Sequence, residues 1–434
     1  MARRKYNRGS QPTLGATMEH ATPLVTNDAV TLGLLAVILG AIFYTENSDH
    51  PFWRGFYRYV PALLLCYFLP SLLNSFGVVD GEASGLYFVA SRYLLPTCLV
   101  LLTLSVDFAA IARLGYKAIV MFLTGTVGIV LGGPLSILIV GAVSPDVVSG
   151  QGPEAVWRGM TTVAGSWIGG GANQTAMKEI FQVEDAVFSQ MVAVDVLCAS
   201  VWMAVLLFLA GRSAAIDRHT GADTGAIETL KERVKQFHAR HGRIATLPDL
   251  IFIVSIGFGV TGLAHACAGV IAPWIENHAP ALARLSLTST FFWIIVIATT
   301  VGLGLSFTRA RHLEGAGASK VASAMLYVLV ATIGMRMDVG AVFDNPGLFA
   351  LGFVWIGFHA LLLVIVARLI RAPLFYLAVG SQANVGGAAS APVVASAFHP
   401  SLAPVGVLLA VLGYALGTYA AWICGLLMSA INGG

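Results

Sequence analysis

The sequence predicts an all-α polytopic membrane protein made of two inverted repeats. Each repeat would hold about five transmembrane helices and one re-entrant or broken glycine-rich helix segment. Three observations predict this fold class. The 434-residue chain is 57% hydrophobic and only 11% charged, whereas soluble domains average about 25% charged residues. Apolar runs recur at about 20 residues, the length that spans a bilayer as a helix. Three short motifs also occur once in each half, in the same order.

Apolar segments follow one another along most of the chain, and all five cysteines lie within them without forming a CxxC pair. No disulfide framework or zinc site is therefore indicated. The net charge of +3 is small and spread over loops, so we expect no nucleic-acid partner. The predicted segments cover residues 29–44, 59–76, 86–105, 117–142, 156–178, 186–210, 248–272, 287–307, 321–335, 347–370, 373–398 and 403–429.

Two polar stretches divide the chain into its parts. Residues 1–28 are predicted to form a polar N-terminal arm that differs from a standard signal peptide. Residues 211–247 are the most charged stretch, and apolar residues recur there at helical spacing from Ile227 to Phe237. A cytoplasmic linker with a short amphipathic helix is expected. The first membrane repeat would then be 29–210 and the second 248–430.

The duplicated motifs indicate that these two repeats are related, because three weak similarities in the same order carry more weight than any one. In the third pair Asp195 corresponds to Gly406. The stretch around Asp107 resembles the stretch around Asp338, GSWIGGGAN (165–173) resembles GSQANVGGAAS (380–390), and VAVDVL (192–197) resembles APVGVL (403–408).

Topology favours a hairpin in each half. Inverted repeats need an odd number of crossings per half, and six segments per half fit only if the glycine-rich one enters and leaves on the same side. With the 211–247 linker inside, basic loop residues also fall inside, as the positive-inside rule requires, although the basic N-terminal arm falls outside. An alternative with twelve crossings makes the repeats parallel. The inside residues would be Arg113, Lys117, Arg309, Arg311, Lys320, Arg368 and Arg371.

The glycine-rich segments carry the predicted chemistry. Non-helical backbone at membrane depth is tolerated only within protein or beside a water-filled cavity. Helix N-termini there bind anionic groups, and freed carbonyls bind cations. Close packing of small residues is the structural alternative. A phosphate loop is excluded because GGGANQTAMK lacks the GK[ST] ending.

Asp195 is a carboxylate within an apolar run, where such groups usually line an ion or proton path. It directly follows the first hairpin, so it can reach that hairpin. We expect a Na⁺ ligand or proton carrier; the alternative is an Asp satisfied by a neighbouring polar group. Asp107 and Asp338 are expected to face loops or cap helices. His265 and His359 are expected to be satisfied buried histidines.

The motif GSWIGGGANQTAMKE (165–179), followed by the helix with Asp195, resembles the DUF819 (YjcL-like) family of multi-spanning membrane proteins. This resemblance implies a distant relation to the cation:proton antiporter and anion-transporter superfamily. It therefore implies scaffold and core domains, elevator-like alternating access and dimers. The implied core site is Gly165 to Thr175, Asp195, and Gly380 to Gly387. The sequence departs from a two-carboxylate antiporter site, because it has no second Asp opposite Asp195.

The expected function is secondary active transport of a small polar solute, anionic or zwitterionic, coupled to Na⁺ or H⁺. The scaffold would be 29–76 and 248–307, and the core 86–210 and 321–430. Asn173, Thr175, Asp195 and Asn384 would form the Na⁺ or proton site. The expected solute-binding residues are Gly165, Ser166, Trp167, Gly169, Gly170, Gly171, Asn173, Gln174, Thr175, Lys178, Ser381, Gln382, Asn384, Gly386 and Gly387.

The remaining expectations concern class and partners. No nucleophile–base pair, GxSxG elbow or HExxH motif occurs, so an enzyme is not expected. A channel or pore is the first alternative to a transporter, and an intramembrane enzyme is a weaker one. We expect no cofactor besides Na⁺ as a coupling ion, contact with membrane lipid, a homodimer, and location in the bacterial inner membrane.

Overall fold

The computed structural model describes residues 23–57, 60, 62–222, 244–337, 345–399 and 402–432. Within these ranges every regular element is a helix, apart from an isolated bridge between Val25 and Val79. Seven of the described helices are long and apolar enough to cross a membrane, or up to nine if two bent helix pairs each form one span. An all-helical polytopic membrane protein is therefore confirmed, while the ten predicted crossings stay a prediction.

The first half contains a series of helices that ends in the short helix α10. Its last long helix, α9, follows directly on the first glycine-rich segment, α8. The helices are α1 (Asp28–Glu46), α2 (Pro51–Tyr57), α3 (Ala62–Ser75), α4 (Leu86–Val89), a π-helical turn (Ala90–Leu94), α5 (Leu95–Leu104), α6 (Phe108–Ala112), α7 (Tyr116–Val143), α8 (Val156–Ile180), α9 (Asp185–Ala210) and α10 (Ser213–Thr220), with 3₁₀ turns at Pro145–Val148 and Gly152–Glu154.

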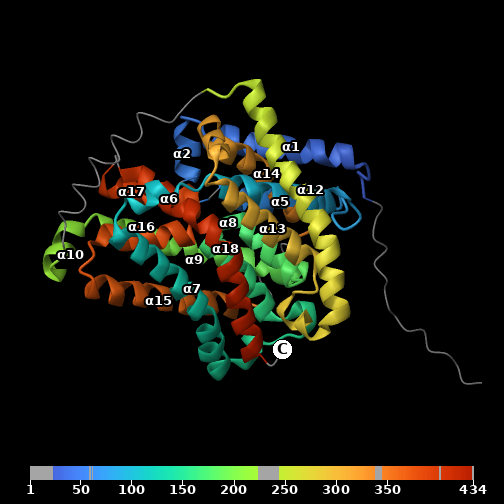
Figure 1. The fold of residues 1–434 in the computed structure, drawn as a ribbon. Helices are drawn as coiled ribbons and strands as arrows, with labels where there is room; N and C mark the ends of the chain where they lie inside the picture. The colour runs from blue at the N-terminus through green and yellow to red at the C-terminus, as the bar shows by residue number, and fades with distance from the viewer. Residues whose placement is uncertain are drawn as a thin grey trace, which may run out of the picture.

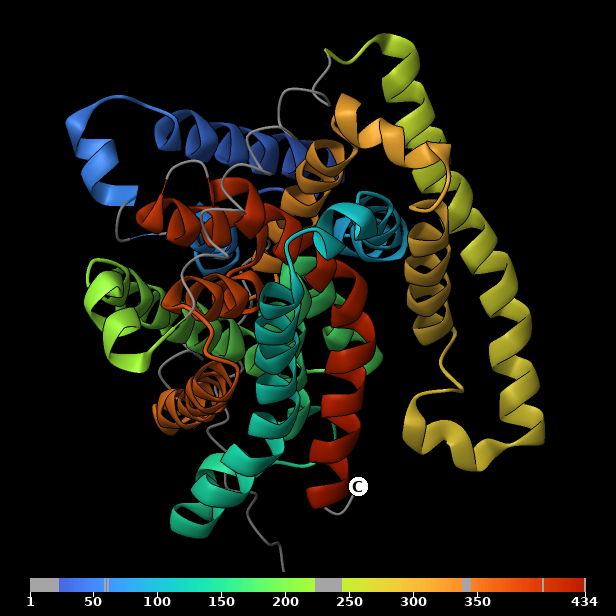
Figure 2. The ribbon, with the colours of Figure 1, turned by 60° about the vertical axis from the view of Figure 1, so that its left-hand side comes forward.

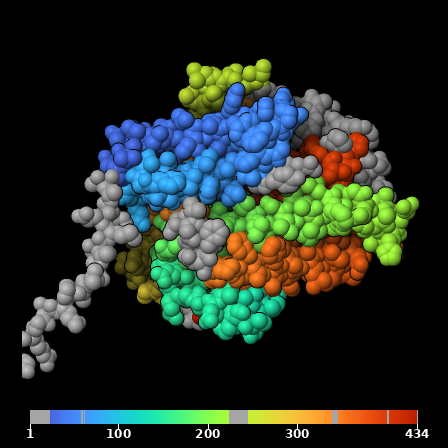
Figure 3. Space-filling model, turned by 180° about the vertical axis from the view of Figure 1, so that it is seen from behind, coloured from blue at the N-terminus to red at the C-terminus, as the bar shows by residue number. Residues whose placement is uncertain are grey.

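The second half has the second glycine-rich segment divided into two helices, α16 and α17. Its helices are α12 (Leu247–His278), α13 (Thr290–Leu305), α14 (Ala318–Gly334), α15 (Gly347–Leu369), α16 (Leu374–Val385), α17 (Gly387–Phe398) and α18 (Ala403–Ile431), with 3₁₀ turns at Pro280–Leu285 and Arg309–Ala316. Figure 2 shows α7 and α18 side by side through the middle of the molecule, and α12 and α13 side by side at its edge. From behind, α9 and α15 cross one face together (Figure 3).

Helices α5 and α14 connect the two halves. Helix α5 contacts α12, α13 and α14 of the second half, and α14 contacts α1 and α3 of the first half. The α14–α3 and α13–α5 contacts each include a glycine at which the two backbones approach closely. A Cβ on Gly334 of α14 would lie 2.3 Å from Tyr67 O of α3, and one on Gly302 of α13 would lie 2.8 Å from Val100 O of α5. Figure 1 shows α5 next to both α13 and α14.

Helix α8 is a helical hairpin. It breaks at Gly170, whose φ of 71° and ψ of −174° fall in a region that essentially only glycine occupies. The chain then returns, because the Trp157 and Phe181 rings lie 5.9 Å apart and Glu184 N donates to Pro153 O at 3.1 Å. An unbroken helix of this length would separate its ends by about 38 Å. The predicted break and return are present.

The second glycine-rich segment is also a hairpin. Helices α16 and α17 meet at Gly386 and Gly387, and Gly387 has a φ of 58°. At the other end of the hairpin the Phe375 and Phe398 rings lie 5.4 Å apart. We refer to α8 as hairpin 1 and to α16–α17 as hairpin 2, and to the residues around Gly170 and Gly386 as their tips.

The two hairpins begin at opposite ends of α9. Hairpin 1 adjoins the start of α9, where Lys178 Nζ lies 2.6 Å from Asp185 Oδ1. Hairpin 2 adjoins α10, which follows the end of α9, because Leu374 N donates to Asp217 Oδ1 at 2.8 Å. The pKa of the Asp217 carboxyl is raised above its usual value, because partial burial raises it by more than this hydrogen bond lowers it. At 1.5 Å per residue α9 is about 39 Å long, so the hairpin bases are far apart.

Several predictions concern loops. Asp107 caps α6 by accepting a hydrogen bond from Ala110 N at 2.9 Å and pairs with Arg311 at 3.2 Å, so its predicted capping role is confirmed. Asp338, the 227–237 helix and most of the N-terminal arm lie outside the described residues. Helix α10 lies within the predicted linker, where no helix was expected at that position.

Candidate functional site

Asp195 lies between the two arms of hairpin 1. Ser166 Oγ donates to Asp195 Oδ2 at 2.6 Å, Trp167 Nε1 donates to Oδ1 at 2.7 Å, and Gln174 Nε2 donates to Oδ2 at 3.1 Å. Ser166 and Trp167 belong to the first arm and Gln174 to the second. The carboxylate therefore joins the arms, and its predicted reach to the first hairpin is confirmed.

All partners of this carboxylate are neutral. Asp195 is 6% exposed, and none of the ion pairs found in the described part of the chain includes it. Tyr67 OH extends the group by donating to Gln174 Oε1 at 3.3 Å. A buried carboxylate without a cation is costly, and hydrogen bonds offset that cost only in part. Such a group is suited to gain and lose a positive partner.

The tip of hairpin 1 is partly exposed at the surface of the structure. Ser166, Gly170 and Gly171 are partly exposed, whereas Trp167 and Gln174 are buried. The tip faces α18 and α14: a Cβ on Gly170 would lie 3.5 Å from Tyr414 Cε1. Ser166 thus connects the partly exposed tip to the buried carboxylate.

Asn173 links hairpin 1 to α18 by hydrogen bonds. Its Nδ2 donates to Gly169 O at 2.9 Å, and its Oδ1 accepts from Thr418 Oγ1 at 2.6 Å. The backbones touch here, since a Cβ on Gly417 would lie 2.6 Å from Gly169 Cα. Small residues at this contact allow the close approach. The packing alternative for the glycines therefore holds at Gly169, while the chain geometry at Gly170 requires glycine for its conformation.

Asn384 links hairpin 2 to α7 by hydrogen bonds in a similar way. Its Oδ1 accepts from Thr126 Oγ1 at 2.8 Å, and its Nδ2 donates to Phe122 O at 2.9 Å and to Gly380 O at 3.0 Å. Each hairpin thus has one fully buried Asn that bonds a carbonyl four residues earlier and a threonine of a long neighbouring helix.

A second polar chain links hairpin 2 to α9 and α15. Trp202 Nε1 donates to Ser381 Oγ at 2.7 Å. His359 lies between Ser381 Oγ, at 2.8 Å from Nε2, and Gly125 O, at 3.0 Å from Nδ1. Because a carbonyl only accepts, Nδ1 donates, and Nε2 of a neutral ring accepts from the serine. The prediction of a satisfied buried histidine is confirmed for His359.

The tips of both hairpins approach α18 at one glycine. A Cβ on Gly413 would lie 2.4 Å from Ile168 O of hairpin 1 and 3.7 Å from Ala383 O of hairpin 2. At the tip of hairpin 2, Gln382 Nε2 donates to Ser390 Oγ at 2.7 Å across the two arms. One backbone carbonyl of each hairpin thus lies near Gly413 of α18.

Lys178 belongs to an ionic cluster at the base of hairpin 1. Lys178 Nζ lies 2.6 Å from Asp185 and donates to Tyr87 OH at 3.2 Å. Asp185 also pairs with Arg336 at 2.8 Å. Tyr87 OH in turn donates to Glu179. The Lys178 ammonium is therefore already paired, and its predicted role toward a solute carboxylate stays a prediction.

The residues predicted to bind Na⁺ or a proton fall into separate hydrogen-bonded groups. Asp195 belongs to the Ser166 group, Asn173 bonds Thr418, Asn384 bonds Thr126, and Thr175 Oγ1 donates to Gly171 O at 3.0 Å. In the described part of the chain no three His, Cys, Asp or Glu residues cluster as metal ligands. Around Asp195 the neighbouring side chains present N–H and O–H donors, which suit the Asp195 carboxylate itself. A Na⁺ ion binds oxygen atoms, so the Gln174 side-chain amide would have to turn before its oxygen could reach an ion beside Asp195.

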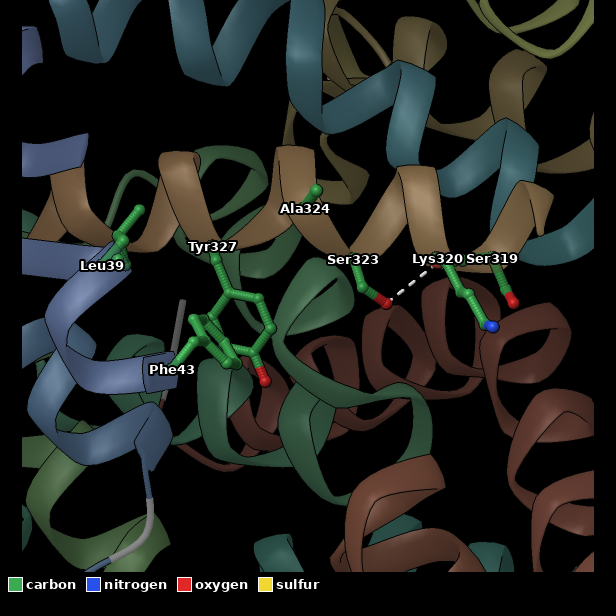
Figure 4. Close-up of a pocket in the computed structure, with 8 residues that line it drawn as sticks. Leu39, Phe43, Ser319, Lys320, Ser323, Ala324 and Tyr327 are labelled. Carbon is green, nitrogen blue, oxygen red and sulfur yellow. Dashed lines mark hydrogen bonds between the residues drawn. The ribbon is translucent and has the colours of Figure 1, made fainter. Parts of the chain in front are cut away.

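A groove of about 470 Å³ lies between α1 and α14. Phe43 and Tyr327 pack edge to face along it with ring centroids 4.6 Å apart (Figure 4). Ser323 Oγ donates to Ser319 O at 2.9 Å on the α14 side, next to Lys320. None of the predicted site residues lines this groove, so it is distinct from the hairpin tips.

Several contributing residues were not predicted from the sequence. Tyr67, Thr126, Trp202 and Thr418 bond the hairpins from helices far away in the chain. A signal was available for some of them, because a threonine or tyrosine within an apolar run can hydrogen-bond across helices. Which hairpin each would meet could not be read from spacing.

Comparison with known proteins finds a similar membrane protein and a matching family. The chain is 24% identical over 366 residues to the "Uncharacterized membrane protein YjcL" of Bacillus subtilis (strain 168), covering 80% of this chain and 85% of that protein. Residues 33–431 match the family described as "Protein of unknown function (DUF819)". This match includes both hairpins and the helix that carries Asp195, and the chain therefore belongs to the DUF819 family of proteins.

Proposed function

We propose that the protein is a secondary active transporter for a small polar solute, anionic or zwitterionic, coupled to Na⁺ or H⁺. The observation that carries this proposal is the Asp195 carboxylate held between the arms of a broken hairpin by Ser166, Trp167 and Gln174. Paired breaks in corresponding halves are the typical sign of a transporter site. A carboxylate without a cationic partner gives that site a group that a coupling ion can neutralise.

Alternating access would follow an elevator-like movement of two inverted repeats. The hairpin bases at opposite ends of α9 support the inversion, because one hairpin then enters from each side of the membrane. The reciprocal contacts of α5 and α14 with helices of the other half support related halves. Residues 29–76 and 248–307 would form the scaffold and the contact between subunits of a homodimer, in a bacterial inner membrane.

A channel is the second candidate, and it would need a continuous path lined by charges or carbonyls. The tip of hairpin 1 instead approaches the α18 backbone closely at Gly413 and Gly417, and Ala383 O of hairpin 2 also lies near Gly413, which favours a closed site. Solute uptake into proteoliposomes, with and without a Na⁺ or H⁺ gradient, tests the proposal. Accumulation above the external concentration only with a gradient is expected. Uptake that merely equilibrates would indicate a channel, and chemical conversion of the solute would indicate an enzyme.

A further inference from the structure

Gln382 has a buried oxygen without a partner. The residue is 1% exposed, and its Nε2 donates to Ser390 Oγ, yet among the described residues nothing donates to its Oε1. A buried acceptor that is left unpaired costs free energy, and most such groups in proteins are satisfied. An orphan acceptor at the tip of a hairpin indicates a missing donor or cation.

In hairpin 1, polar residues on both sides of the tip bind a charged group. Ser166 and Gln174 lie four residues before and four after the break at Gly170, and both donate to Asp195. In hairpin 2, Gln382 of the first arm and Ser390 of the second arm flank the turn at Gly386 and Gly387, and they bond each other across the arms. Both hairpins therefore carry a polar pair across their arms at the tip.

The charged partner of the pair is absent in hairpin 2. Gly406 corresponds to Asp195 in the repeated motif, and no side chain fits there, since a Cβ would lie 2.5 Å from Ala391 O. In hairpin 1 the chain supplies the acceptor and its donors. In hairpin 2 it supplies an acceptor, Gln382 Oε1, to which no described residue donates.

We propose that Gln382 Oε1 binds a small cationic group at the tip of hairpin 2, either the ammonium of a zwitterionic solute or Na⁺. Both take oxygen ligands, and hydrogen bonds between a charged and a neutral group are stronger than those between neutral groups. Ala383 O, from the next residue, and Ile168 O of hairpin 1 both lie near Gly413 of α18, and α8 and α16 contact each other. The cation site thus lies where the two hairpins meet, and it deepens the proposed function, on which its role in transport rests.

Thermal unfolding of the purified full chain in detergent tests the site without any gradient. NaCl, KCl and methylammonium chloride are titrated at constant ionic strength with choline chloride. Saturable stabilisation by Na⁺ alone identifies an ion site, and stabilisation by methylammonium alone identifies an ammonium site. Gln382→Met should raise the half-saturating concentration about tenfold or more. Gln382→Glu should retain the response, because it keeps an oxygen ligand.

Two further variants guard against a folding effect. Ser390→Ala keeps Gln382 Oε1 but removes its anchor across the arms, so a smaller loss of the cation response is expected. Ser396→Ala on the same helix removes only a bond to Pro392 O at 2.8 Å and should leave the response unchanged. An equal response of Gln382→Met and the unmodified chain overturns the proposal. Stabilisation by sodium acetate that depends on the acetate also overturns it, because the amide would then present its N–H.

This test is separate from the test of transport. Cation binding that depends on Gln382, together with no gradient-driven uptake, would contradict the proposed function and leave the binding site standing. Gradient-driven uptake, together with no effect of cations on unfolding in any Gln382 variant, would contradict the binding site and leave the proposed function standing.

Discussion

At the scale of single residues, hairpin 1 holds the Asp195 carboxylate through side chains of both its arms. The carboxylate accepts from Ser166, Trp167 and Gln174, and these donors come from both arms. Hydrogen bonds to a charged group contribute about 1.5–3 kcal/mol each. The hydrogen bonds therefore stabilise the closed hairpin as long as Asp195 keeps its charge, and a change of that charge would be felt in both arms.

A double-mutant cycle between Ser166 and Asp195 measures this coupling. Ser166→Ala should lower the free energy of unfolding by about 1.5–3 kcal/mol. The same change should cost less than half as much in an Asp195→Asn background, because the serine then bonds a neutral amide. Denaturation of the purified protein gives all four values. Equal costs in both backgrounds would show that Ser166 does not act through the carboxylate.

At the scale of helices, the break in α8 depends on one glycine. Gly170 has a positive φ of 71° with an extended ψ of −174°, and Gly171 next to it has no positive φ. The sequence predicted a break within a run of glycines but could not say which glycine makes it. The local geometry explains why the two neighbours should respond differently to the same substitution.

Gly170→Ala should destabilise the protein by about 1–3 kcal/mol, since alanine is strained in this region. Gly171→Ala is the matched control: its added Cβ would lie 3.9 Å from Leu326 Cδ2, an ordinary contact, so little change is expected. Thermal unfolding compares the two variants. A larger loss in Gly171→Ala than in Gly170→Ala would contradict the described break.

Features formed by residues close together in the chain could be predicted from the sequence, whereas contacts between distant helices could not. The two breaks, the reach of Asp195 to the first hairpin and the cap at Asp107 follow from residues close together in the chain. The bonds of Tyr67 to Gln174 and of Trp202 to Ser381 join residues far apart. Such contacts depend on how helices pack, which a single sequence does not fix, so the helices that complete each hairpin could not be identified.

At the scale of the whole molecule, α9 sets the distance between the hairpin bases. Its start adjoins hairpin 1 at Asp185, and its end leads into α10, where Asp217 accepts from Leu374 of hairpin 2. In a membrane this arrangement requires the hairpins to enter from opposite sides, provided that α9 crosses the bilayer. The helix is one of the seven that are long and apolar enough to do so.

Cysteine accessibility tests this topology. Gln151, Glu184 and Arg218 are exposed, and a single cysteine is placed at each in a background without native cysteines. Gln151→Cys and Glu184→Cys flank hairpin 1 and should react with an impermeant maleimide from one side. Arg218→Cys, in α10, should react only from the other side. Labelling of Gln151→Cys and Glu184→Cys from different sides would contradict the hairpin, and labelling of all three from one side would contradict the inversion.

The most direct test of the central claim, that Asp195 couples the solute to an ion, compares two modes of transport in proteoliposomes. Asp195→Asn keeps the size of the side chain and removes its charge, so it should lose gradient-driven accumulation but keep exchange of labelled for unlabelled solute across the membrane. Asp195→Glu should retain part of the accumulation. Unchanged gradient-driven accumulation by Asp195→Asn would contradict the account.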